Sequence, residues 1–133
     1  MIYALFIGLI FCHFLADFTH LSTNWMLSAK KLGTPLFPIF CHAATHAVMQ
    51  VFFIYVWVSL LINRICPFYS FFYKVFLFQI ITHFLIDVWK GKMNKWFTLL
   101  QSPANKWHWI VFGFDQFLHT TIIYFTYEYI LNL

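Results

Sequence analysis

The sequence predicts an all-α protein, an integral membrane bundle of four helices, and two observations support this fold class. Hydrophobic residues make up 62% of the 133 residues and charged residues only 9%, whereas a soluble domain carries about 25% charged residues. The apolar residues also gather in four runs, and a helix needs about 20 such residues to cross a bilayer. Helices are expected because the runs are too long for barrel strands, and because lipid admits only backbone whose polar groups are bonded internally.

The four runs are interpreted as a single transmembrane domain that covers residues 1–133. The first run carries two ionisable residues and no basic start, so it is interpreted as a retained helix rather than a signal peptide. Pro38 opens the second run, and proline suits the first turn of a helix. Gly8 and Gly113 are expected to let neighbouring helices approach closely. The predicted helices span about residues 1–19, 38–63, 70–89 and 107–130.

Two short interfacial helices are expected in the loops between these runs. Residues 22–24 (Ser-Thr-Asn) are typical N-cap residues and Gly33 is a typical stop, which predicts a helix that ends near Lys31. Residues 92–101 predict a helix at the membrane surface, because its lysines can extend toward water while its Trp, Phe and Leu side chains insert into lipid.

The basic residues are distributed unequally between the two sides of the bundle. Loop 20–37 holds two lysines and loop 90–106 holds four, whereas the opposite side holds Arg64, Lys74 and the amino terminus. Because loops rich in Lys and Arg stay in the cytoplasm, both lysine-rich loops are predicted to be cytoplasmic and both chain ends to lie outside. The net charge of +4 is therefore expected to hold the loops against anionic lipid, and nucleic acid is not expected as a partner.

Each predicted helix carries one pair of ionisable residues at positions i and i+4. This spacing puts both side chains on one face of the helix, one turn apart. The pairs lie near the C-terminal ends of the first and third helices and in the N-terminal halves of the second and fourth. All four pairs are therefore expected at one depth, in the cytoplasmic leaflet. The eight residues are His13, Asp17, His42, His46, His83, Asp87, Asp115 and His119.

An ionisable residue inside a membrane is costly, so such residues indicate a functional site. Imidazole and carboxylate groups are ligands of divalent transition metals, and all eight residues are candidate ligands. Since one metal takes three or four of them, one or two ions are expected, with zinc first and iron or manganese as alternatives. Asp17, Asp87 and Asp115 are the candidate catalytic residues, together with Lys90, which is expected to meet a substrate phosphate at the membrane edge.

Four short motifs, each centred on one of the ionisable pairs, follow one another along the chain. They are HFLADF…NWM…K at 13–30, H-x-x-x-H at 42–46, HFLIDVWK at 83–90 and FDQFLH at 114–119. Their order and spacing resemble a family of small bacterial and phage membrane proteins that offers no established activity. The resemblance covers nearly the whole chain and implies a multi-pass protein of the bacterial inner membrane.

A weaker resemblance is to a group of proposed membrane-bound metal-dependent hydrolases. CHAATHA supplies His42, Thr45 and His46, and THFLID supplies His83 and Asp87, but the Arg-Gly that often follows the first histidine in that group is lacking. Those proteins are in turn similar to zinc phospholipase C and single-strand nucleases. The resemblance thus implies phosphoester hydrolysis by analogy.

The leading hypothesis is a membrane-embedded metal-dependent hydrolase that acts on a lipid or lipid-linked phosphoester at the cytoplasmic interface. One alternative is transport or conduction of a metal ion or proton, against which the mostly apolar outer half of the bundle argues. Another is a non-catalytic phage or bacterial membrane interaction protein, and a hydrogen-bonded structural core is the remaining interpretation of the pairs. The expected partners are the lipid bilayer and a lipid substrate, and a homo-oligomer is left open.

Overall fold

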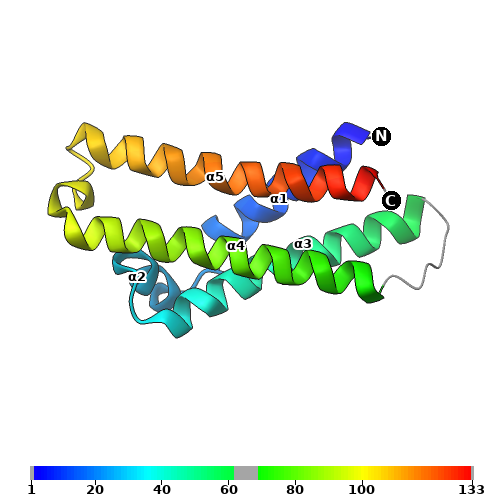
Figure 1. Ribbon diagram of the computed structural model, residues 1–133, viewed down its shortest axis with the longest axis horizontal. Coiled ribbons are helices and arrows are strands. Elements are labelled where there is room, and N and C mark those ends of the chain that lie inside the picture. The colour runs from blue at the N-terminus through cyan, green and yellow to red at the C-terminus, as the bar shows by residue number, and fades with distance from the viewer. Residues whose placement is uncertain (1, 62–68, 133) are drawn as a thin grey trace.

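The computed structural model describes residues 2–61 and 69–132, and within these ranges the chain is all-α, as predicted. Four long helices lie beside one another in the cyclic order α1, α3, α4, α5, each packed against two neighbours (Figure 1). Their bounds are Ile2–Phe18 for α1, Leu36–Leu61 for α3, Tyr69–Trp96 for α4 and Lys106–Leu131 for α5. The short helix α2 is Asn24–Leu32, and the short 3-10 helix η1 is Thr98–Gln101.

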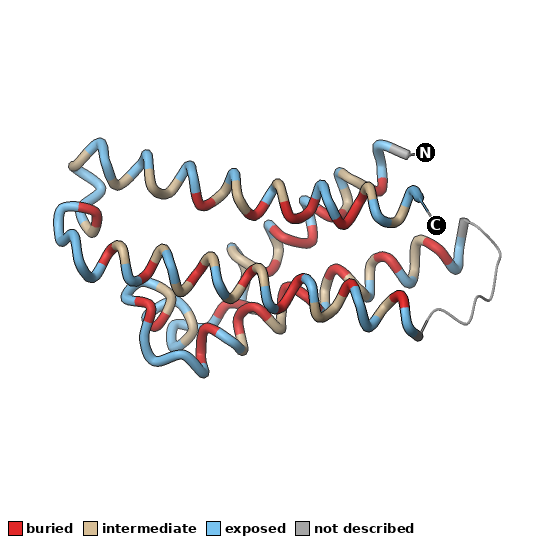
Figure 2. Tube along the Cα trace, viewed as in Figure 1, coloured by how far each residue is buried: buried red, intermediate tan, exposed pale blue. Residues whose placement is uncertain are grey.

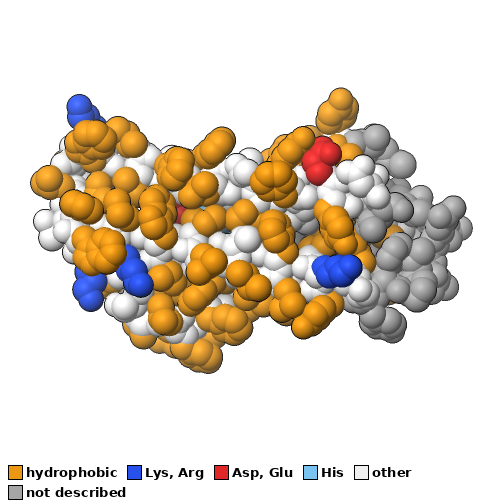
Figure 3. All heavy atoms as spheres, in the orientation of Figure 1, with side chains coloured by type: hydrophobic (Ala, Val, Ile, Leu, Met, Phe, Trp, Pro, Cys, Tyr) orange, Lys and Arg blue, Asp and Glu red, His pale blue; other side chains and the backbone are white. Residues whose placement is uncertain are grey.

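The two ends of the bundle differ in content. The termini lie at one end, and α2, η1 and the α4–α5 connection lie at the other. Most of the visible Lys and Arg side chains gather at the α2 end, and apolar side chains cover much of the rest of the visible face (Figure 3). Both lysine-rich loops therefore lie at the same end. Arg64, which the charge argument puts on the opposite side, lies outside the described residues, as do residues 62 and 63 of the predicted second helix.

Helix α2 folds back onto α4, and two glycines make this contact close. The Thr23 side chain caps α2 by accepting a hydrogen bond from the Met26 N–H at 3.4 Å, and Gly33 ends it in the left-handed conformation with φ of 69°. A Cβ added at Gly91 would overlap the backbone of Gly33 and would lie 2.6 Å from the Lys30 carbonyl oxygen. A side chain at residue 91 would therefore separate α2 from α4.

The structure differs from the sequence prediction around residue 92. Helix α4 does not end at residue 89 but continues to Trp96, so the separate 92–101 helix is wrong and only η1 remains of it. The charges after residue 89 mark where water is expected, but charge does not stop a helix. No proline lies between residues 89 and 96, and Gly91 is buried against α2, so nothing in the sequence ends α4 near residue 89.

The two glycines predicted to serve packing behave differently. Gly8 faces the Phe53 ring closely enough that a methyl group would displace it. At Gly113 the prediction is wrong, because an added Cβ would meet no atom within 4 Å. Pro38 is the third residue of α3 rather than its first, and it still lies in the first turn, where a missing N–H costs no hydrogen bond.

The burial pattern is inverted relative to a water-soluble protein. Many large apolar side chains on the outer faces are exposed, including Phe52 at 63% and Phe117 at 62%, and Figure 2 shows exposed residues recurring along every long helix (Figure 2). By length and composition α3 and α4 are apolar enough to cross a membrane, whereas the apolar stretch of α1 is shorter. An apolar core does exist at the end near the termini, where Leu9, Ile54 and Ile123 are buried.

Candidate metal centre

The interior of the bundle is polar at the level where the four predicted pairs meet. Each long helix presents its pair inward, and the eight side chains are at most 9% exposed. Asp17 on α1 illustrates the convergence of these residues. Its carboxylate lies 3.3 Å from His13 Nε2, 3.2 Å from His42 Nε2 and 3.5 Å from His46 Nε2. The structure thus brings together all eight residues singled out from the sequence.

The imidazole rings form a continuous group at the centre. Ring centroids are 3.9 Å apart for His46 and His83, and 4.2 Å apart for His83 and His119. His13 completes the group with its centroid 4.6 Å from that of His46. Among them, the nitrogens of His13, His46 and His83, from three of the long helices, are close enough to hold one ion.

Four groups of three residues have ligand atoms close enough to hold a metal ion. Within each group the atoms lie within 4.8 Å of one another. Two of the groups share no residue, so the interior could hold two ions at once. The groups are His13 with His46 and His83; Asp17 with His42 and His46; His42 with His83 and Asp87; and Asp87 with Asp115 and His119.

The ammonium of Lys30 reaches into this cluster from α2. Lys30 Nζ lies 2.9 Å from Asp17 Oδ1, 3.2 Å from Asp87 Oδ1 and 3.0 Å from His42 Nε2. Burial lowers the pKa of this ammonium, but the Asp87 and Asp17 carboxylates outweigh burial and hold the pKa above its usual range. Lys30 is thus a fixed cation among three candidate metal ligands.

The tautomer of His42 follows from its hydrogen bonds. The Ser22 hydroxyl donates to the Ala16 carbonyl at 2.7 Å, so its oxygen accepts from His42 Nδ1 at 2.9 Å. His42 Nε2 is then the unprotonated nitrogen, and it accepts from Lys30 at 3.0 Å. Metal-ligating histidines are commonly oriented in this way, by donating the other ring N–H to a fixed acceptor.

His119 is held in the same manner on α5. Its Nδ1 lies 2.9 Å from the Asp115 backbone carbonyl and donates to it. The remaining nitrogen, Nε2, lies 3.8 Å from Asp87 Oδ1 and has no hydrogen bond to any described residue. Asp115 is oriented from another side, because its Oδ2 accepts from Lys90 Nζ at 2.6 Å and from the Gln116 amide at 3.1 Å. A free imidazole nitrogen and the free Asp115 Oδ1 are thereby left in the interior.

Several buried polar atoms of the cluster have no hydrogen-bond partner among the described residues. Leaving such an atom unpaired in an apolar interior costs about 1–3 kcal/mol, and ligand atoms that await a cation produce this pattern. The atoms are both ring nitrogens of His13 and His46, Nε2 of His83 and His119, both carboxylate oxygens of Asp87, and Oδ1 of Asp115.

A pocket of about 420 Å³ opens beside the cluster at the α2 end. Asp17, Lys30 and Lys90 form part of its lining and belong also to the cluster or its ion pairs. Lys31 lines it as well and is exposed. The pocket therefore connects the lysine-rich end of the bundle with the buried carboxylates.

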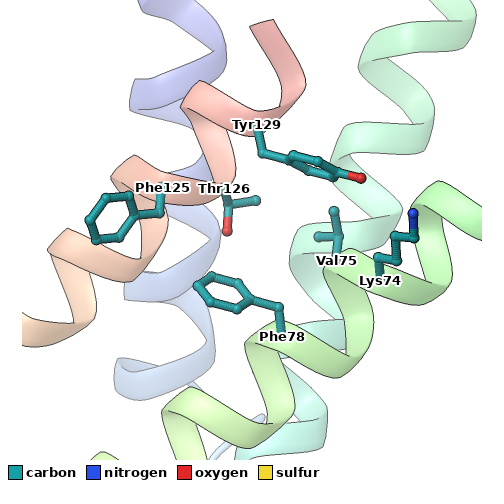
Figure 4. Close-up of a pocket in the computed structure, with 6 residues that line it drawn as sticks. All are labelled: Lys74, Val75, Phe78, Phe125, Thr126 and Tyr129. Carbon is teal, nitrogen blue, oxygen red and sulfur yellow. The ribbon is translucent and has the colours of Figure 1, made fainter. Parts of the chain in front are cut away.

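The polar stripes continue for one turn beyond the cluster and then stop. Gln79 donates to the Thr126 hydroxyl at 2.6 Å, whereas both amide atoms of the buried Gln50 are unpaired among the described residues. Further out, a groove of about 600 Å³ lies between α4 and α5, and Figure 4 shows Phe78 and Tyr129 among the side chains that line it (Figure 4). That groove is almost entirely apolar.

Sequence reasoning missed two members of the site. Lys30 was expected only to orient the loop, and Ser22 only to cap a helix, yet both contact His42. The motif at 13–30 ends at Lys30, but it gives this residue no role in the cluster. A further pointer in the sequence is a pair of glycines, at positions 33 and 91, that allow α2 to approach α4.

Comparison with known proteins gives a family and no activity. No curated protein and no solved structure matches the chain. A family model described as protein of unknown function (DUF3307) matches residues 5–133. Because this match spans nearly the whole sequence, the chain belongs to the DUF3307 family.

Proposed function

We propose that this protein is a membrane-embedded metal-dependent hydrolase that acts on a lipid or lipid-linked phosphoester. The observation that supports this most is the convergence of five imidazoles and three carboxylates from four helices, with several ligand atoms left unpaired. A purely structural polar core would be expected to satisfy its own hydrogen bonds. These atoms instead converge without hydrogen-bond partners among the described residues, as the ligands of a cation do, and Asp87 Oδ1 already lies 3.2 Å from the Lys30 ammonium.

The inverted burial pattern supports a membrane location. Polar residues such as His46, Gln50 and Asp87 are fully buried, while large apolar side chains cover the outside. Water would make this arrangement unfavourable, and lipid makes it favourable. We therefore take α1 and α5 as spanning the bilayer together with α3 and α4, with α2 and η1 at the cytoplasmic surface and both termini outside, in the bacterial inner membrane.

The donor set fits zinc best. Zinc accepts imidazole nitrogen and carboxylate oxygen in groups of four, and a catalytic zinc commonly has three protein ligands and one open position. Iron and manganese accept the same donors. The triplet of Asp87, Asp115 and His119 shares no residue with the triplet of Asp17, His42 and His46, nor with that of His13, His46 and His83. It and either of the other two would hold two ions. Ions of this kind supply Lewis acidity and activated water for phosphoester hydrolysis.

The protein's own residues have separable roles in this proposal. Ser22 and the Asp115 carbonyl orient His42 and His119 through their Nδ1 atoms. Lys30 balances Asp17 and Asp87 at the edge of the cluster. Lys90 lies at the pocket and is held by Asp115 at 2.6 Å, where it can bind a substrate phosphate oxygen. The apolar surroundings exclude bulk water and strengthen each of these interactions.

Transport is less well supported. A conducted ion needs polar groups through both leaflets, and here the stripes end at the layer of Gln50, Gln79 and Thr126. Beyond that layer lies the part of the apolar core that contains Val58 and Phe71. This apolar segment lies between the cluster and the other end of the bundle.

Metal analysis of the purified full-length protein in neutral-lipid nanodiscs tests the proposal first. We expect stoichiometric zinc at neutral pH, its loss in His46→Gln and His83→Gln, and full retention in His20→Gln, because His20 is exposed and outside the cluster. Release of phosphate or alcohol from phosphoester lipids should follow the metal content. A wild-type protein without stoichiometric transition metal would sink the proposal, and zinc-independent metal flux in liposomes would favour transport.

A further inference from the structure

The pocket at the α2 end combines positive charge with immediate access to the cluster. Three lysines line it, Lys30 and Lys31 from α2 and Lys90 from α4, and its volume of about 420 Å³ exceeds that of a single water by an order of magnitude. Asn94, Gln101 and His108 line the same pocket and add polar groups. Among the residues that the structure describes, Asp17 is the only carboxylate in its lining.

The charges at the pocket and cluster balance before any ion binds. Asp17, Asp87 and Asp115 carry three negative charges, and the three lining lysines carry three positive charges. Asp17 and Asp87 contact Lys30, and Asp115 contacts Lys90. Lys31 is exposed and has no ion pair among the described residues, so one cation of the pocket is uncommitted. A divalent metal ion in the cluster would make the assembly net positive by two charges.

We propose that this pocket is a binding site for the phosphate group of the substrate, held between Lys31 and Lys90 next to the metal cluster. The proposal rests on the proposed function and names its recognition element. Lysine is a regular phosphate ligand, acting as a point charge. Lys90 remains able to donate further hydrogen bonds while it holds Asp115, because an ammonium has three N–H groups.

The walls of the pocket also accommodate the group that carries the phosphate. Phe18, Leu27 and Phe112 line it beside the lysines, and Lys90 Nζ lies 4.9 Å from the centre of the Phe112 ring. Apolar and cationic groups thus line the same opening at the end of the bundle. Such a lining suits a phosphate group at the membrane surface, whether the phosphate belongs to a lipid headgroup or is free in solution.

Binding measurements on the full-length protein in neutral-lipid nanodiscs test the site separately from catalysis. The probes are inorganic phosphate, short-chain phosphatidic acid and the corresponding diacylglycerol, each titrated by calorimetry with and without zinc. We expect phosphate-bearing probes to bind and diacylglycerol not to compete, and we expect zinc to strengthen binding at least tenfold. Tighter binding of phosphatidic acid than of phosphate assigns the lipid headgroup, and equal binding assigns the phosphate alone.

Two lysine variants provide the decisive comparison. Lys31→Ala should weaken phosphate binding roughly tenfold, as expected for loss of one charged hydrogen bond, with zinc content unchanged. Lys92→Ala removes an exposed lysine of the same end that does not line the pocket and should leave binding unchanged. Equal effects of the two substitutions, no effect of Lys31→Ala, or equally tight binding of a short-chain fatty acid would overturn the assignment. Absence of zinc with Lys31-dependent phosphate binding would instead refute the hydrolase and keep the site.

Discussion

Lys30 Nζ lies 2.9 Å from Asp17 Oδ1, although Lys30 belongs to a short helix outside the apolar spans and Asp17 to α1. The same ammonium is 3.2 Å from Asp87 Oδ1, so one lysine neutralises carboxylates from two helices. The Lys30 ammonium occupies the position that a metal ion bound to the same carboxylate oxygens would occupy. The lysine therefore has a dual consequence, for the stability of the bundle and for its affinity for cations.

Replacing Lys30 by methionine should separate these two effects. Loss of the ammonium leaves two buried carboxylates uncompensated, and we expect the free energy of unfolding to fall by about 3 kcal/mol without metal. Zinc should bind the variant more tightly than the wild type, because its ligands no longer share their charge with Lys30. Denaturant titration with and without zinc measures both quantities. The exposed Lys31→Met serves as control, and equal destabilisation by both substitutions would contradict this role of Lys30.

The contact between Gly33 and Gly91 should prove necessary for the position of α2. In Gly91→Ala the new methyl group meets backbone atoms of Gly33 and Lys30, so α2 must move and Lys30 must withdraw from Asp17. We expect a loss of thermal stability of several degrees, and crosslinking between α2 and α4 should decrease. Gly113→Ala is the matched control. Its methyl group meets nothing within 4 Å, and alanine in a helix should add about 0.5–1 kcal/mol of stability.

The number of bound ions should respond to single ligand substitutions. Two triplets share no residue, so we expect two zinc ions per chain. Asp115→Asn weakens only the triplet with Asp87 and His119, and it should reduce the content to about one ion. Glu128→Gln changes an acid outside the cluster and should leave two. Plasma mass spectrometry on protein of known concentration gives the ratio, and an unchanged ratio in Asp115→Asn would exclude the α4–α5 triplet as a site.

Gln50 offers a test of whether the polar stripe serves passage through the bundle. Its amide is fully buried and unpaired among the described residues, so Gln50→Leu should stabilise the protein by about 1 kcal/mol and leave zinc content intact. Gln79→Leu breaks the 2.6 Å hydrogen bond to Thr126 and should destabilise it by a similar amount. Unfolding in mixed micelles measures both. A loss of function in Gln50→Leu with full zinc content would point to conduction.

The part of the site that the sequence predicts is the part carried by helical periodicity. Ionisable residues at i and i+4 lie on the same face of a helix. Because neighbouring helices run in opposite directions, pairs near alternate helix ends come to the same level of the bundle. All eight of these residues meet in the structure. The all-α class, which the long apolar runs predicted, is confirmed over the described residues.

Lys30 and the end of α4 could not be predicted in this way. The position of Lys30 depends on how α2 docks, which follows from a close backbone contact between residues 33 and 91 and has no periodic signal. The end of α4 was assigned to residue 89 because charge begins at Lys90, whereas helices end where capping or a breaker ends them. In both cases the prediction took a charged side chain as a sign of exposure to solvent.

For the membrane location proposed above, the distribution of ion pairs along the chain bears on how the protein would be inserted. Asp17 forms an ion pair with Lys30 within the first half of the chain, the hairpin of α1 to α3. Asp115 forms one with Lys90 within the second half, the hairpin of α4 and α5. Each hairpin can therefore insert with one carboxylate already neutralised. Asp87 alone depends on the other half, through Lys30 at 3.2 Å. Association of the halves is thereby linked to compensation of one remaining charge, so a separately synthesised second half should leave the translocon poorly until the first half is present.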